Sequence, residues 1–136
     1  MKQFEYLEHT ADAKFRAYGK TLEEAFANAA LAAFNILTDI TRVQPKIKHE
    51  IKIHYKKKES LLYDFLDQLL FLLDTEGFIL AKVDKIKITS SELTATVSGD
   101  SYKNYDVHGD IKSVTYNDML IEEKPNKVIV QVVLDI

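Results

Sequence analysis

Acidic residues near the two ends of the chain raise the question of whether they hold a ligand. His9 and Asp12 lie close together in the segment EHTADAKFRAYG, residues 8–19, between two strand-like stretches. Asp135 is the penultimate residue, after an otherwise apolar stretch, and the carboxylate of Ile136 follows it. Negative groups so close repel each other unless a cation, a basic side chain or water offsets their charge. Such oxygen ligands suit calcium or magnesium, whereas a simple turn at Asp12 and a frayed chain end in water would need no ion.

Two other charged residues have positions that call for an explanation. Asp39 follows the first predicted helix, where the helix macrodipole disfavours an anion by about 0.3–1 kcal/mol. Lys112 opens the penultimate predicted strand and, taken alone, is an ordinary exposed lysine. The stretch GDSYKNYDVHGD, residues 99–110, does not fit the spacing of a calcium-binding loop, and we interpret it as a polar surface connection.

Composition limits the classes of protein that the sequence can encode. A chain of 136 residues with 46% hydrophobic content predicts one domain, residues 1–136. The net charge of −3 argues weakly against strong non-specific nucleic-acid binding, although a local basic patch is compatible with it. The lack of cysteine excludes a disulfide framework, a thiolate zinc site and a cysteine nucleophile. No signal-peptide-like start and no membrane-spanning apolar stretch occur, so we expect a soluble, cytoplasmic protein that does not contact a membrane.

Two amphipathic helices are the clearest predicted elements. TLEEAFANAALAAFNILTDI, from Thr21, has apolar residues at three-and-four spacing, and Thr21 with Glu24 forms a capping-box pattern. ESLLYDFLDQLLFLLDTEG has a second apolar stripe and ends at Gly77, a typical helix stop. Each stripe needs a sheet face to cover it.

The remaining segments predict strands. FEYLEHT with AKFRAYG, and GFILAKVDKIKI with SELTATVSGD, form two strand pairs, and KIKHEIKIHYKKK alternates as a half-exposed strand. IKSVTYNDMLIEE and NKVIVQVVLDI predict a final hairpin turned at 124–126, and the continuous apolar run of the last strand places it centrally in the sheet. The predicted fold class is therefore α+β, with two amphipathic helices packed on a mainly antiparallel sheet.

Four segments together resemble the archease family. YLEHTADAKFRAYGKTLEEAFANAALAAFNILTD is similar to the N-terminal half of archeases, and LLYDFLDQLLFLLDTEGFI is similar to their second helix. IKSVTYNDM resembles their Lys-Ala-(Val/Ile)-Thr-Tyr-His segment, and VVLDI resembles their C-terminal ending. The resemblance runs from about Tyr6 to Ile136 and implies a fold containing a strand–helix–strand–strand unit, which agrees with the predicted elements.

The resemblance implies an accessory function rather than an enzyme activity. Archeases are small non-catalytic cofactors of the tRNA-splicing RNA ligase, which joins a 2′,3′-cyclic or 3′-phosphate RNA end to a 5′-hydroxyl end. They promote guanylylation of the ligase, allow it to turn over repeatedly and relax its nucleotide requirement. The expected partner is therefore this ligase, through which the chain would mainly reach RNA. No residue pattern sets the oligomeric state.

The resemblance also implies roles for particular residues. The family's metal site falls on Asp12, Asp135 and the main chain or terminal carboxylate of Ile136, with calcium as the usual divalent cation. The family's functionally important lysine falls on Lys112. Asn117 stands where many relatives have histidine, so no histidine role transfers there.

Some roles and alternatives stay open. His9 belongs to the matching motif and would serve either around the metal or in packing, and Asp39 is retained as a candidate functional residue.

A metal hydrolase with His9 as base lacks a recognisable nucleophile, and the sequence contains no GxxxxGK[ST], GxGxxG, HExxH or GxSxG motif. A general RNA-binding module is disfavoured by the acidic balance and by the lack of interleaved aromatic and basic residues. A chaperone-like role towards RNA-processing enzymes such as methyltransferases is the main alternative.

Overall fold

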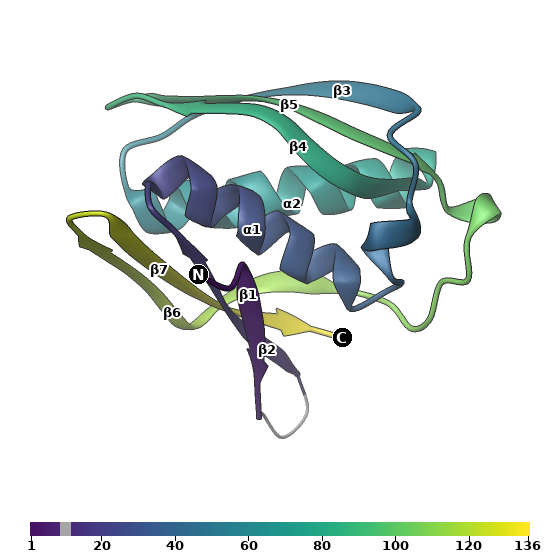
Figure 1. The fold of residues 1–136 in the computed structure, drawn as a ribbon, viewed down its shortest axis with the longest axis horizontal. Helices are drawn as coiled ribbons and strands as arrows, with labels where there is room; N and C mark the ends of the chain where they lie inside the picture. The colour runs from purple at the N-terminus through teal and green to yellow at the C-terminus, as the bar shows by residue number, and fades with distance from the viewer. Residues whose placement is uncertain (9–11) are drawn as a thin grey trace.

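In the part of the chain that the structure describes, seven strands form two separate antiparallel sheets (Figure 1). The computed structural model describes residues 1–8 and 12–136. The first sheet has the order β1-β2-β7-β6, with strands β1 (Phe4–Leu7), β2 (Ala13–Gly19), β6 (Ser113–Lys124) and β7 (Lys127–Asp135). The second has the order β3-β5-β4, with strands β3 (Ile47–His54), β4 (Phe78–Ile88) and β5 (Glu92–Ser101). Two short 3₁₀ helices, η1 (Ile40–Arg42) and η2 (Tyr102–Asn104), lie in the connections.

The two helices lie between the sheets as a middle layer (Figure 1). Helix α1 (Leu22–Asn35) contacts strands of both sheets, and so does α2 (Lys58–Glu76). The rings of Phe26 on α1 and Phe65 on α2 stack, with centroids 6.3 Å apart, and both are fully buried. The prediction of an α+β fold with two amphipathic helices on antiparallel strands is confirmed, with the strands divided between two sheets instead of one.

The position between two sheets explains why α1 is buried more widely than a single apolar stripe would be. Its buried residues are Leu22, Ala25, Phe26, Asn28, Ala29, Ala30, Ala32, Ala33 and Phe34. Alanines on neighbouring faces of the helix let both sheets approach closely, because their side chains occupy little volume. The predicted pattern of one stripe facing one sheet was therefore too narrow.

The helix-end signals in the sequence are confirmed. The Thr21 hydroxyl accepts a hydrogen bond from the Glu24 main-chain N–H at 3.1 Å, and the Glu24 carboxylate accepts one from the Lys20 N–H at 3.3 Å. Gly77 follows α2 in the left-handed conformation, at a φ of 67°, where glycine carries no Cβ penalty.

The predicted strand–helix–strand–strand unit is the segment β3–α2–β4–β5. Strand β5 pairs antiparallel with both β3 and β4, and α2 crosses between those two outer strands. In the other sheet, β7 lies between β2 and β6 as its apolar run predicted. Its hairpin with β6 turns at Pro125–Asn126, where Asn126 has a φ of 60°.

Gly99 on β5 is required by a close approach of the backbone. A Cβ at this position would lie 1.9 Å from the carbonyl oxygen of Ile79 on β4. We therefore expect Gly99→Ala to lower the free energy of unfolding by about 3 kcal/mol or more, at the upper end of overpacking effects. Gly109→Ala is the matched control, because a Cβ there meets nothing within 4 Å and only the φ of 71° opposes it, at roughly 1–2 kcal/mol. Urea denaturation of both variants measures their free energies of unfolding, and equal decreases in the two variants would contradict the prediction.

Candidate functional site

The start of β2, the end of β7 and the start of β6 meet at one corner of the four-stranded sheet, which we call the acidic corner (Asp12, Lys112, Asp135 and Ile136). Ala13 pairs with Leu134, and Asp12 immediately precedes this last paired position. Asp12 therefore lies next to Asp135, which itself pairs with Ser113 on β6. Figure 1 shows the C-terminus beside the beginning of β2. The fold thus brings together the two ends that the sequence analysis considered.

Lys112 is attached to this corner through its main chain. Its N–H donates a hydrogen bond to the Asp135 carbonyl at 2.7 Å. The Lys112 side chain is exposed, and Ile136 is 42% exposed. The lysine is therefore held beside the end of β7 with its ammonium group accessible to a partner.

The acidic side chains lie on the sheet face that is turned away from the helices. Leu134 is fully buried in the core, and successive side chains on a strand point to opposite faces, so Asp135 points outward. Asp12 and Asp135 are both half-buried. Paired positions on adjacent antiparallel strands have Cα atoms about 4.5–5.5 Å apart, a spacing at which two carboxylates can share one cation.

Sequence reasoning missed a basic residue near this corner. Lys14, two positions after Asp12 on β2, places its Nζ 3.4 Å from a carboxylate oxygen of Asp118 on β6. The signal that could have found it is the strand period of two, which puts residues 12 and 14 on the same face.

The oxygen-rich donor set fits a hard divalent cation such as calcium. It would consist of the two carboxylates of Asp12 and Asp135 with the carboxylate or carbonyl oxygen of Ile136. Within residues 1–8 and 12–136, no group of three or more His, Cys, Asp or Glu side chains is placed to hold a metal. The remaining ligands would therefore have to come from main-chain oxygens or water.

The other two candidate residues lie differently. His9 is outside the described residues. Asp39 begins η1 as its cap and accepts hydrogen bonds from the Thr41 N–H at 3.1 Å and the Thr41 hydroxyl at 2.6 Å. The Thr41 hydroxyl, followed by the main-chain N–H, lowers the pKa of Asp39 below its ordinary value. The unfavourable position after α1 is thus offset by favourable contacts within the next turn.

Asp39 also borders a separate polar cavity of about 420 Å³ between η1 and the 102–108 connection. The main-chain N–H of His108 donates to the carbonyl of Leu37 at 2.7 Å and attaches that connection to the end of α1. Asp39 makes its contacts inside this region and not with the acidic corner.

Asp100 is the buried carboxylate of the same region. It accepts hydrogen bonds from the Tyr105 hydroxyl at 2.8 Å, the Ser101 N–H at 2.8 Å and the Asn104 amide at 3.3 Å. The Tyr105 hydroxyl, followed by the Ser101 N–H, lowers the pKa of Asp100 below its ordinary value of 3.8. These hydrogen bonds indicate that Asp100 stabilises the conformation of the polar connection that follows β5.

The lowered pKa of Asp100 predicts a pH-dependent contribution to stability. Because the folded-state pKa lies below the unfolded one, the contribution is complete above pH 3.8 and is lost as the pH falls through the folded-state value. We expect Asp100→Asn to melt at a lower temperature than wild type at pH 7, with the difference shrinking below pH 3.8. Thermal unfolding from pH 7 to pH 2 measures the melting temperatures of wild type and variant. A difference in melting temperature that stays constant over this range would contradict the stabilising role of the ionised Asp100.

Comparison with known proteins decides the family. A profile of the Archease protein family (MTH1598/TM1083) matches residues 4–136. The chain belongs to the archease family. It is 42% identical to the protein archease of Methanosarcina barkeri, over 99% of this chain and 97% of the relative. It is 41% identical to the protein archease of Methanothermobacter thermautotrophicus, with both chains covered completely.

Solved structures show the same fold. The solution structure of Methanobacterium thermoautotrophicum protein 1598 is 37% identical, covers both chains completely and superposes with a TM-score of 0.85. The crystal structure of an archease from Thermotoga maritima, at 21% identity, covers 96% of this chain and 94% of that one with a TM-score of 0.61. Neither helix in the described part of the chain is long and apolar enough to cross a membrane.

Proposed function

We propose that the chain is a non-catalytic protein cofactor of the tRNA-splicing RNA ligase. The observation that carries the proposal is the convergence at one surface corner of Asp12, Asp135 and Lys112, which come from three distant parts of the sequence. The chain's membership of the archease family over residues 4–136 supports the proposal. The resemblance to this family implies the ligase as the partner.

The chemistry of the corner suits a partner site that handles nucleotide phosphates. A divalent cation bound there would offset the repulsion between the two carboxylates and supply positive charge. Asp12 and Asp135 would hold that ion, Ile136 would supply a further oxygen ligand, and main-chain oxygens or water would supply the rest. The exposed ammonium of Lys112 would contact phosphate or an acidic group of the ligase. We propose that the corner docks near the ligase's nucleotide pocket and favours guanylylation there.

The test is multiple-turnover RNA joining with the cognate ligase. The substrates are an RNA ending in a 3′-phosphate and one beginning with a 5′-hydroxyl, each in large excess over ligase. We expect the purified chain to raise the number of joined products per ligase molecule at least tenfold. Unchanged joining would contradict the proposal.

A chaperone-like role is the alternative, since the Thermotoga maritima archease is described as a possible chaperone. The same assay separates the two roles when the fraction of active ligase is measured before and after incubation. A chaperone would raise joining only by preserving active ligase. A cofactor raises the rate per active ligase from the first minutes.

A further inference from the structure

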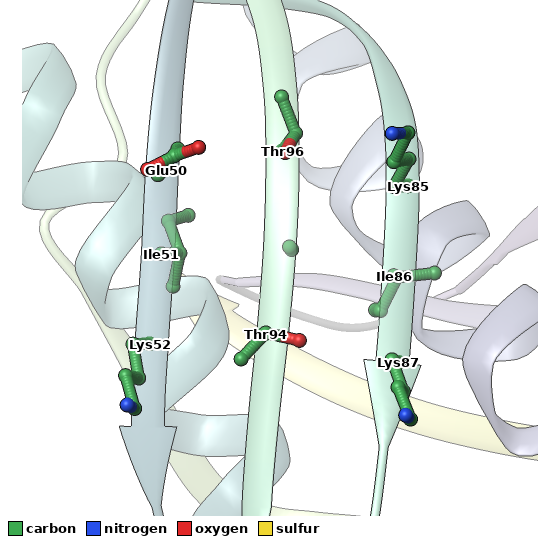
Figure 2. A pocket seen from close by; sticks show the side chains of 9 residues that line it. Glu50, Ile51, Lys52, Lys85, Ile86, Lys87, Thr94 and Thr96 are labelled. Atoms are coloured by element: carbon green, nitrogen blue, oxygen red, sulfur yellow. The ribbon is translucent and has the colours of Figure 1, made fainter.

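The outer face of the three-stranded sheet has a regular basic pattern that the proposed function does not use. On β5, Leu93, Ala95 and Val97 are buried towards the helices. The intervening residues 94, 96 and 98 lie on the opposite face, because side chains alternate along a strand. Figure 2 shows Thr94 and Thr96 in the middle of this face, between side chains of β3 and β4.

The strand register arranges this face in three rows, which we call the lysine face. In each row a hydroxyl residue of β5 lies between one residue of β3 and one of β4. The rows are Lys52–Thr94–Lys87, Glu50–Thr96–Lys85 and Lys48–Ser98–Lys82. On β3 and β5 the rows repeat every two residues, at about 6.6 Å, on the scale of neighbouring phosphates in an extended nucleic-acid strand. On β4 a register shift between Val83 and Lys85 makes Lys82 and Lys85 three residues apart, while each still pairs with its row on β5.

The rows contain five lysines and one acidic residue, Glu50. Lys52 lies 3.7 Å from Glu92, and Lys82 lies 3.4 Å from Asp84. Within the described part of the chain, Lys48, Lys85 and Lys87 form no ion pair. These lysines are exposed and flank the hydroxyl residues of β5 from both sides.

The centre of the lysine face is hollowed and offers free donors. A cavity of about 480 Å³ lies over the rows of Thr94 and Thr96. Neither threonine hydroxyl forms a hydrogen bond to another group in residues 1–8 or 12–136, whereas Ser98 donates to Asp84. Hydroxyls between ammonium groups are suitable donors for phosphate oxygens.

We propose that the lysine face binds the phosphodiester backbone of single-stranded RNA. The face has phosphate donors but no exposed aromatic ring among its rows for base stacking. Binding there would follow the phosphate backbone, whose contacts carry no sequence information. It also has no exposed apolar side chain to enter a lipid surface. The acidic net charge of the whole chain does not oppose this, because the rows concentrate lysines on one face while the chain carries −3 in total.

The lysine face and the acidic corner belong to different sheets, on opposite sides of the helix layer (Figure 1). RNA binding at the lysine face therefore goes beyond the ligase proposal and does not depend on it. A chain with both surfaces would hold substrate RNA while its acidic corner contacts another protein.

The experiment measures fluorescence anisotropy of a labelled 20-nucleotide oligo(U) with the full chain, from 25 to 200 mM salt. Three unpaired lysines predict a slope of log affinity against log salt of about −2 for single strands. We expect the triple variant Lys48→Gln, Lys85→Gln, Lys87→Gln, which removes those three lysines, to lose at least tenfold in affinity at 50 mM salt. The matched control is Lys20→Gln, Lys57→Gln, Lys127→Gln, which removes equal charge from exposed lysines outside the face.

The outcomes decide the proposal. A loss of RNA affinity in the lysine-face variant, with full RNA binding by the control variant, supports the proposal, provided that circular dichroism shows both variants to be folded. No binding by wild type at 25 mM salt, or equal loss in both variants, would overturn it. Binding of anionic lipid vesicles or a polyglutamate peptide as tightly as RNA, with the same loss in the first variant, would overturn RNA as the occupant.

Discussion

Replacing Asp135 by asparagine is expected to abolish stimulation of the ligase while the domain stays folded. The substitution keeps the size of the side chain but removes the negative charge next to Asp12. A calcium ion at the proposed site would therefore lose one of its carboxylate ligands. We expect Asp12→Asn to have the same effect, with at least tenfold weaker calcium binding by calorimetry and at least tenfold less joined RNA. Stability without calcium should change little, because removing one of two like charges also removes repulsion.

A matched control variant is Asp67→Asn. Asp67 is an exposed acidic residue on α2, outside the acidic corner, and the substitution changes net charge by the same amount. We expect it to retain full stimulation and calcium binding. Full stimulation by both corner variants would show that the corner is not the functional site.

Replacing Phe26 by alanine is expected to have the largest effect on stability. Phe26 is fully buried between the sheets and stacks on Phe65 at a centroid distance of 6.3 Å. Removal of a buried phenylalanine ring leaves a cavity and costs about 3–5 kcal/mol, which is a large part of the total stability of a domain of this size. Chemical denaturation followed by circular dichroism measures the loss.

Phe71→Ala is the control for that measurement. Phe71 lies on α2 as Phe65 does, but it is 56% exposed. The same chemical change should therefore cost much less, within about 1 kcal/mol. Comparable losses in the two variants would contradict the three-layer packing of the helices between the sheets.

The helices could be predicted from the sequence because their signals are local. Apolar spacing, the Thr21–Glu24 capping box and the Gly77 stop all act within a few residues of one another. The division into two sheets could not be predicted, because strands such as β2 and β3 alternate in the same way. Pairing between distant strands decides which sheet each one joins, and no local pattern encodes that choice.

The acidic corner shows the same limit at the level of single residues. Asp12 and Asp135 were candidates because of their types, yet only the β2–β7 register places them side by side. The resemblance to archeases supplied that pairing beforehand, and local physics did not. The lysines of β3 and β4 were equally visible in the sequence, but their rows arise only when β5 lies between the two strands.

The most direct test of the ligase proposal is the rate of covalent guanylylation of the cognate ligase in a single turnover. The reaction is followed with labelled GTP in the presence of calcium, with wild type, Asp135→Asn or no added chain. The proposal predicts at least tenfold acceleration by wild type and the unassisted rate with Asp135→Asn. Equal rates with wild type and with no added chain would contradict the cofactor function, and equal acceleration by both proteins would contradict the role of the acidic corner.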